Sequence, residues 1–278
     1  MSIAVPDLPV RKLTIDLAAG FARHWHGGDA YRSMYFNALS MSFPVGEQFF
    51  IDSVRAGLAA LPDTPAHAPL RTLAAQFIGQ EATHRHLHAL YNRHLEQQGL
   101  RNHWQHWAQR RVDYCRRRRF SAVNQLAITA AYEHFTAVLA GAALGHQWLE
   151  GADEQMQTLW YWHSAEETEH KAVAFDLYRA LGGGRLRRIA WYVYIFAVFA
   201  TESTLQTLIN LRRDRNLWRL RTWGSALRFW CGGNGMLRRC ALPLLDYLRP
   251  GFHPDDDDNR ASAARWLEDN RHRWTRVK

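Results

Sequence analysis

Apolar residues recur along most of the chain at intervals of three and four positions, which is the spacing of one face of an α-helix. Four long segments show this spacing, and we expect a helix over each of 31–61, 65–98, 121–150 and 153–181. Pro62, Gly99 and Gly182 supply the breaks that end three of them, and Ser121 is a favourable N-cap for another. The pattern therefore predicts a protein built from long helices.

The rest of the chain has a weaker pattern of the same kind. Residues 100–120 mix tryptophan with arginine, and we read them as a connection with one short helix. Further helices are expected over 186–211, 216–230, 235–248 and 260–275, with a loop over 250–258. No alternating strand pattern or Asn-Gly hairpin signal competes with this interpretation. The fold class that the sequence predicts is all-α.

Composition narrows the class of protein. The chain has 278 residues, of which 47% are apolar and 22% charged, so a disordered or collagen-like chain is excluded. Three cysteines without C-x-x-C spacing argue against a disulfide framework and favour a reducing, cytoplasmic location. The first 16 residues do not resemble a secretory signal, and the apolar run 189–200 is shorter than the roughly 20 residues that span a bilayer.

Two E-x-x-H motifs carry the candidate chemistry. They are Glu81-x-x-His84 and Glu167-x-x-His170, each in the middle of an expected helix. The other two long helices each carry a single central glutamate, Glu47 and Glu133. Both glutamates precede the next motif by 34 residues, and adding 86 to the first set of positions gives the second set. This regularity predicts an internal duplication, with two helix pairs related by an approximate twofold axis.

The spacing within each motif suits a metal ion. Residues three apart share one face of a helix, so a glutamate and a histidine can bind the same ion. One glutamate from each of two helices, with E-x-x-H from the other two, is the ligand set of ferritin-like di-iron and di-manganese proteins. A lone glutamate is more often solvated, but Glu47 and Glu133 lie among apolar neighbours, where an uncompensated charge is costly. We expect two metal ions, with iron or manganese favoured and zinc an alternative.

His163 lies one helical turn before Glu167, on the same face, and is the seventh expected ligand. The alternative is that His163 packs beside the site without binding metal. Glu166 and Glu169 point elsewhere on the helix, so we expect partners of the ligands or surface residues. His86 and His88 are left out of the ligand set. The expected metal ligands are Glu47, Glu81, His84, Glu133, His163, Glu167 and His170.

The ligand series resembles that of the di-iron N-oxygenases of the p-aminobenzoate N-oxygenase type, which also carry an extra histidine one turn before the second E-x-x-H. That resemblance covers residues 35–180 and is one of spacing. Over most of its length the chain also resembles an uncharacterised bacterial family of predicted metal-dependent hydrolases, through the stretches 43–50 and 250–254. These resemblances imply a ferritin-like four-helix bundle over 31–181, with a helical extension over 185–278, in a single domain spanning 1–278.

The two resemblances imply different reactions at the same metal centre. A site rich in carboxylates suits activation of O2 as a co-substrate, so we favour an oxygenase or oxidase acting on a small organic or lipid-like substrate. A dinuclear hydrolase would use metal-bound hydroxide, and the sequence offers no separate acid or base for it. A ferroxidase or storage bundle and a non-catalytic metal-binding scaffold are further alternatives. Catalytic residues beyond the metal centre, the electron donor and the substrate are not specified by the sequence.

The C-terminal third combines aromatic residues with arginines between residues 189 and 223. The net charge of the chain is +9, and only three of its 35 basic residues are lysines. Such a segment can lie on an anionic membrane surface, which would place the protein at the inner face of the membrane, or it can simply cover the bundle. No nucleic-acid-binding motif accompanies the charge, so we expect no nucleic-acid partner. A homodimer is left open.

Overall fold

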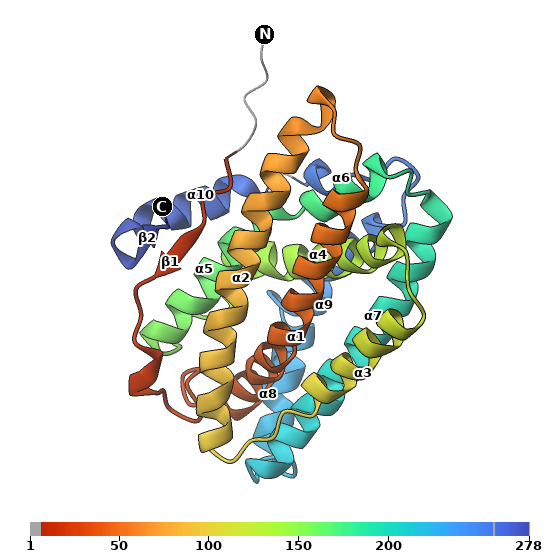
Figure 1. The fold of residues 1–278 in the computed structure, drawn as a ribbon. Helices are drawn as coiled ribbons and strands as arrows, with labels where there is room; N and C mark the ends of the chain where they lie inside the picture. Colours follow the sequence, from red (N-terminus) through yellow and green to blue (C-terminus); the bar gives the residue numbers. More distant parts are fainter. Residues whose placement is uncertain (1–6, 258, 278) are drawn as a thin grey trace.

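The computed structural model describes residues 7–257 and 259–277, and it confirms the all-α class (Figure 1). The expectations for residues 1–6, 258 and 278 lie outside the described residues. The helices are α1 (Ala30–Ala60), α2 (Ala68–Gln97), α3 (Trp104–Arg117), α4 (Ala122–His146), α5 (Glu154–His170), α6 (Val173–Ala180), α7 (Arg185–Arg213), α8 (Leu220–Cys231), α9 (Met236–Asp246) and α10 (Arg260–Asp269).

The four long helices expected from the sequence form, with one correction. Asp29, Ser121 and Asp153 cap α1, α4 and α5 with their side chains, as short polar residues do at helix starts. The segment expected as one helix over 153–181 is instead two, because the chain turns at Lys171 and Ala172. The buried Lys171 ammonium donates to Asn259 Oδ1 at 2.9 Å. Helical periodicity cannot reveal a contact with a segment so distant in the chain.

Pro44 lies inside α1 without ending it. A proline cannot donate the hydrogen bond that the carbonyl four residues earlier expects, which here is the carbonyl of Ser40. The side chain of Asn92 on α2 supplies that bond at 2.9 Å, and Asn102 donates to the carbonyl of Met41 at 2.8 Å. Two asparagine side chains therefore satisfy the backbone of α1 just before the turn that carries Glu47.

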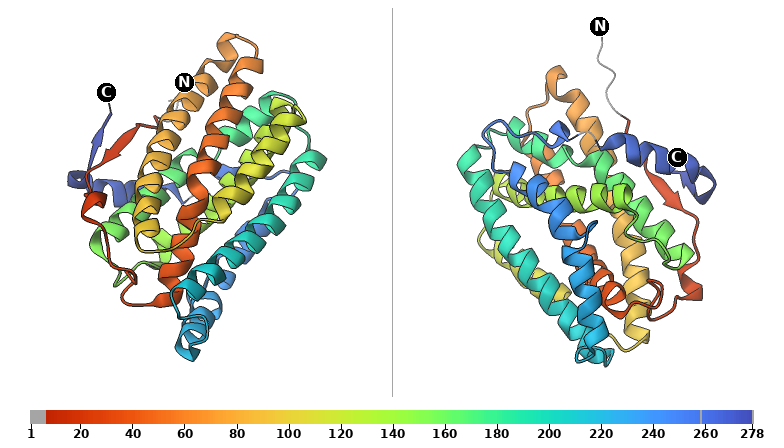
Figure 2. Two further views of the ribbon diagram at one scale, coloured as in Figure 1. Left: turned by 60° about the horizontal axis from the view of Figure 1, so that its bottom comes forward. Right: turned by 180° about the vertical axis from the view of Figure 1, so that it is seen from behind.

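The helices pack around a common centre (Figures 1 and 2). α1 packs on α2, α4 packs on α5, and α1 and α4 also contact each other. α7 crosses both α1 and α4, while α3 and α8 lie against α1, α9 against α4 and α10 against α5. The buried apolar residues form two clusters. Along α1, Met41 belongs to one cluster and Phe49 to the other, so Glu47 lies where the clusters meet.

A short antiparallel ribbon was not expected from the sequence. β1 (Arg11–Leu13) pairs with β2 (Trp274–Arg276), so Lys12 lies opposite Thr275. The last helix expected over 260–275 accordingly ends at Asp269, and the following residues turn into β2. Strands of three residues are too short to show a period of two, and their pairing joins segments at opposite ends of the chain.

Among the described residues, α4 and α7 are long and apolar enough to cross a membrane by length and composition alone. The apolar window of α4 is 72% buried inside the protein, as expected for a core helix, whereas that of α7 is 33% buried. α4 is thus accounted for by the core, and much of α7 faces outward.

Candidate metal centre

The structure brings the six glutamates and histidines of the duplicated pattern together at the centre of the fold. They come from four helices: Glu47 from α1, Glu81 and His84 from α2, Glu133 from α4, and Glu167 and His170 from α5. All six are at most 3% exposed. Their side chains form overlapping groups in which the candidate ligand atoms lie within 4.8 Å of one another. Identification of this cluster as a metal centre stays a prediction.

Glu81 and Glu167 lie between the two histidines. Glu81 Oε1 is 3.7 Å from His84 Nδ1 and 3.2 Å from His170 Nε2. Glu167 Oε1 is 3.5 Å and 3.6 Å from the same two nitrogens. Glu133 Oε2, by contrast, is near one histidine only, 3.4 Å from His170 Nε2. The two E-x-x-H glutamates therefore occupy the middle of the cluster, and the single glutamates its two sides.

The cluster leaves an unusual number of buried polar atoms without a hydrogen-bond partner. They are both carboxylate oxygens of Glu47, Glu81 and Glu133, Oε2 of Glu167, Nδ1 of His84 and Nε2 of His170. A buried polar atom without a partner costs about 1–3 kcal/mol, and more if it is charged. The histidine nitrogens and carboxylate oxygens converge, and both are ligand atoms of divalent metals. This donor set fits two metal ions.

The pKa values of the clustered glutamates also indicate that the cluster needs a neutralising positive charge. Burial, and after it the charge of neighbouring carboxylates, raises the pKa of Glu47 and Glu133 well above the usual value. Burial also acts to raise the pKa of Glu167, but the hydrogen bond from His163 and the positive charge of His170, 3.6 Å away, outweigh it and hold that pKa well below its usual value. Without metal, protons must therefore neutralise part of the cluster.

Each E-x-x-H histidine is oriented by the residue that precedes the other motif's glutamate. His84 Nε2 is 3.0 Å from Glu166 Oε2, and His170 Nδ1 is 2.9 Å from Gln80 Oε1. Gln80 and Glu166 are themselves 86 residues apart, so the exchange follows the internal duplication. Hydrogen bonds of this kind fix the ring of a metal-binding histidine and make it a better ligand. The 86-residue offset between Gln80 and Glu166 is visible in the sequence, but only Glu166 was expected from it as a possible partner of a ligand.

Arg11 is a residue of this site that the sequence did not suggest. It lies in β1, is 4% exposed, and its guanidinium contacts Glu166 at 3.0 Å and Glu169 at 2.7 Å. Its positive charge partly neutralises the acidic residues behind His84. The two partners are more than 150 residues away in the chain, so no local pattern could have revealed the contact.

His163 lies beside the cluster but differs from the six. Its Nε2 is 3.0 Å from Glu167 Oε1, its Nδ1 is 2.7 Å from His88 Nε2, and its ring stacks on His84. His88 in turn contacts Ser40 Oγ at 2.8 Å. Both ring nitrogens of His163 thus have partners, whereas the six have orphaned atoms. A metal at His163 Nε2 would have to replace its contact with Glu167, and its role as a ligand stays a prediction.

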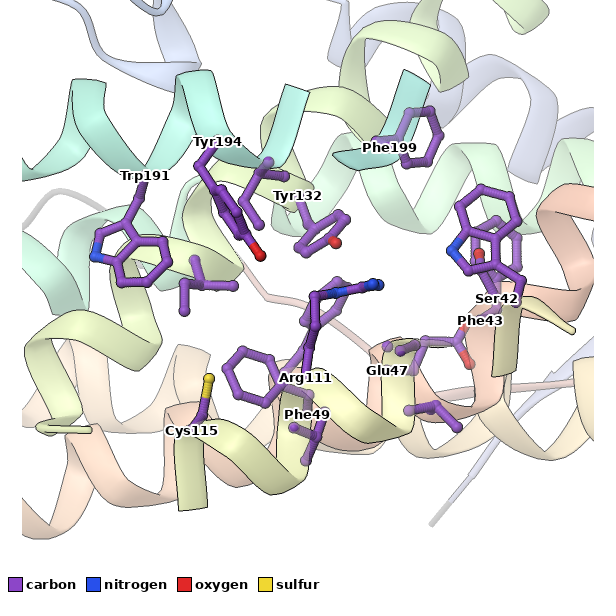
Figure 3. Close-up of a pocket in the computed structure, with 18 of the residues that line it drawn as sticks. Ser42, Phe43, Glu47, Phe49, Arg111, Cys115, Tyr132, Trp191, Tyr194 and Phe199 are labelled. Carbon is purple, nitrogen blue, oxygen red and sulfur yellow. The ribbon is translucent and has the colours of Figure 1, made fainter. Parts of the chain in front are cut away.

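An apolar cavity adjoins the cluster on the Glu47 side (Figure 3). Its volume is about 530 Å3, and α1, α3, α4 and α7 line it. Among the described residues, Glu47 is the only carboxylate that lines it. Arg111 lies near the middle of the view, with Cys115 and Trp191 at the left, away from Glu47. Arg111 is ion-paired with Glu202 at 2.6 Å, so its charge is neutralised. The cavity lies within the size range of small-molecule sites.

Comparison with known protein families gives a match over most of the chain. The profile of a family described as predicted metal-dependent hydrolase matches residues 9–258. A search of curated proteins and of solved structures found nothing that matches the chain. The matched range contains the whole buried cluster and the residues that line the cavity. The chain therefore belongs to the family of predicted metal-dependent hydrolases.

Proposed function

We propose that this chain is a dinuclear metal enzyme that uses O2 to oxidise an apolar organic substrate. The observation that carries the proposal is the buried set of orphaned carboxylate and imidazole atoms beside an apolar cavity. Iron fits such a mixed oxygen and nitrogen set, and manganese or zinc are alternatives. When bound, a pair of iron ions would supply the redox chemistry with O2 that no protein side chain provides.

The positions of the side chains suggest how two ions would be held. Glu81 and Glu167 each lie near both histidines, so each of them would be able to hold either ion. Glu47 and His84 would complete one site, and Glu133 and His170 the other. The two residues that complete one site then correspond to the two that complete the other, at an offset of 86 positions.

The chain itself would supply orientation and a dry environment. The cavity places a substrate against Glu47, at the side of the cluster where α1 faces α3 and α7. Tyr132 lines this cavity, and burial, which is the largest cause, raises its pKa to about 12. It therefore stays protonated and can donate a hydrogen bond to a bound substrate. Aromatic and aliphatic side chains supply most of the remaining wall and exclude water from the reacting atoms.

Hydrolysis is the second candidate, because the family description names it. A dinuclear hydrolase polarises its substrate and activates water on the metal ions. Such a site commonly has an acid or base beside the metals, yet in the part of the chain that the structure describes the only carboxylate lining the cavity is Glu47, which belongs to the expected ligand set. This shortage of a free acid or base favours oxidation over hydrolysis.

Anaerobic loading with ferrous iron tests the proposal. We expect two irons per chain and a change in the optical spectrum when O2 is admitted, with both lost in a Glu81→Gln/Glu167→Gln variant. A Glu150→Gln variant, altered at an exposed glutamate, is the matched control. Two bound metals with no response to O2, even with a reductant, would support the hydrolase, and no stoichiometric metal would refute both candidates.

Filling the cavity tests the substrate class separately. Val112 lies in the wall of the cavity on α3, and the larger side chain of Val112→Trp should narrow the cavity. We expect this variant to bind two metals but to lose binding of a fluorescent fatty-acid analogue, measured by fluorescence titration. Unchanged binding of the analogue would show that this cavity does not receive apolar molecules.

A further inference from the structure

The large apolar side chains exposed on this protein are concentrated in one part of the chain. Of the 14 such residues among those described, 12 lie between residues 186 and 245. The most exposed are Leu186 (85%), Trp218 (89%) and Leu220 (90%). Single exposed apolar residues are ordinary on a protein surface, but a concentration of this kind marks an interaction site.

The exposed residues follow the helical repeat. In α8, Leu220, Trp223 and Leu227 are spaced by three and four positions, and in α9 Leu237 and Leu245 are eight apart. Each helix also buries its opposite face against the protein. A helix that packs on one side and meets water on the other should be polar outside. These helices are apolar on the outer side as well, so their outer side is suited to an apolar environment.

The same segment carries all of the chain's positive surplus. Residues 185–249 contain twelve arginines and three acidic residues, a difference of +9, which equals the net charge of the whole protein. Two of the three acidic residues form ion pairs with arginines outside this segment, Glu202 with Arg111 and Asp214 with Arg23. Arg219 and Arg221 are exposed and make no ion pair among the described residues. The apolar outer faces are therefore bordered by cationic side chains.

We propose that α7, α8 and α9, with the segment 214–219, form a surface that binds an anionic lipid bilayer; we call it the α7–α9 surface. These helices lie together on the near side in the view from behind (Figure 2). Arginine beside tryptophan and leucine is the composition of helices that lie in the membrane interface. A second copy of the chain is a poorer occupant, because two surfaces of the same +9 segment repel each other.

The α7–α9 surface lies on the bilayer rather than spanning it. The inner face of α7 carries buried polar side chains that are bonded to the rest of the protein. Gln206 Oε1 accepts from the backbone N–H groups of His103 and Trp104, and Asn210 donates to the carbonyl of Met34 at 3.2 Å. These bonds hold α7 along the protein, so only its outer face can enter the lipid.

The α7–α9 surface adjoins the cavity beside the metal centre. Tyr194 of α7 and Tyr114 of α3 both line that cavity, and they are 47% and 48% exposed, so both side chains extend from the cavity wall to the protein surface. Tyr194 also belongs to the exposed apolar set of α7. A membrane-dissolved substrate could thus reach the cavity without crossing water. This connection rests on the proposed function, whereas binding of the surface to lipid does not.

Vesicle flotation tests the lipid surface directly. The full chain is mixed with vesicles of phosphatidylcholine alone or of phosphatidylcholine with phosphatidylglycerol, and the floating fraction is measured. We expect flotation only with the anionic vesicles, and equally for chelator-treated protein. Replacing Arg219, Arg221 and Arg228 with glutamine should weaken partitioning about 100-fold, since each basic residue near an anionic surface contributes about fivefold.

A second variant separates the apolar contribution. Trp218→Glu/Leu220→Glu/Leu227→Glu should abolish flotation, and its circular dichroism should match the wild type because all three side chains are exposed. The matched control adds the same charge at exposed positions elsewhere, with glutamate at Ala59, Thr72 and Ala75. Absence of wild-type flotation, or unaltered flotation of the apolar variant, would overturn the proposal. The proposal would also fall if the wild type forms a dimer but binds no vesicles, and the apolar variant loses that dimer.

Discussion

Replacing Glu133 with glutamine is expected to stabilise the metal-free protein and to reduce the stabilisation that bound metal adds. Both carboxylate oxygens of Glu133 are buried without a hydrogen bond, and the nearest imidazole nitrogen, His170 Nε2, is 3.4 Å away. An ionised carboxylate at this position is costly, and burial raises its pKa well above the usual value. Glutamine has a similar shape and carries no charge.

The two effects have comparable size and opposite sign. An unfolded glutamate has a pKa of about 4.3, so keeping Glu133 protonated near pH 7 costs up to about 3 kcal/mol. Glutamine avoids that cost, so the metal-free variant should gain about 1–2 kcal/mol. A bound ion at 100 times its dissociation constant stabilises a protein by about 2.7 kcal/mol. If one lost carboxylate ligand weakens binding 10–100-fold, it removes about 1–3 kcal/mol of that stabilisation.

Urea unfolding monitored by circular dichroism measures both quantities. The wild type and Glu133→Gln are unfolded in the presence of a chelator and again with saturating Mn2+, which avoids reaction with O2. Glu150→Gln, changed at an exposed position, should leave both curves in place. The reasoning is refuted if Glu133→Gln destabilises the chelator-treated protein while the increment from metal stays that of the wild type.

Three further changes test the surroundings of the site. Glu166→Gln should weaken metal binding 10–100-fold in chelator competition, because the His84 ring loses a charged partner. Gly57→Ala should cost about 1–3 kcal/mol in urea unfolding, since an added Cβ would lie 2.6 Å from Leu177 Cδ2. Asp214→Asn should cost about 1–3 kcal/mol at neutral pH. Burial acts to raise the pKa of Asp214, but hydrogen bonds from a histidine, an arginine and an asparagine hold that pKa below its usual value, so the difference from wild type should vanish as the pH falls through it.

Each of these changes has a control or a contrary outcome. Glu169→Gln alters a carboxylate that also binds Arg11 but contacts neither of the two E-x-x-H histidines, so it should affect metal binding much less. Gly145→Ala adds a Cβ into open space within α4 and should be neutral or slightly stabilising. For Asp214, a destabilisation that persists unchanged in acid would contradict the sign given above.

The sequence predicted the central side chains because their positions follow simple rules. The i,i+3 spacing places Glu81 beside His84, and the 86-residue offset made the corresponding residues of the second half recognisable. The convergence of all six in one buried cluster agrees with that pattern. The reaction, by contrast, depends on what enters the cavity, and residues from four helices determine that. Whether the cluster binds metal and which reaction it supports stay predictions.

Features that depend on contacts between distant segments were not predictable. Arg11 reaches Glu166 across 155 positions, and nothing near Arg11 indicates a buried partner. The turn at Lys171 is stabilised by the segment around Asn259, although the local spacing continues a helix through it. In both places a buried cation forms hydrogen bonds with a distant segment of the chain. Helix periodicity shows only which face of a helix is apolar, so it contains no information about such contacts.

The β1–β2 ribbon has a consequence for the order in which the protein matures. Arg11 helps to neutralise the carboxylates behind His84, and the strand that carries it is paired with residues 274–276. On a ribosome, those residues are made after every candidate metal ligand. The ligands of the cluster can therefore meet during translation, but the charge balance around them is completed only after residue 276 has been synthesised. Insertion of metal is then expected to follow synthesis of residue 276 rather than to accompany synthesis of the ligands.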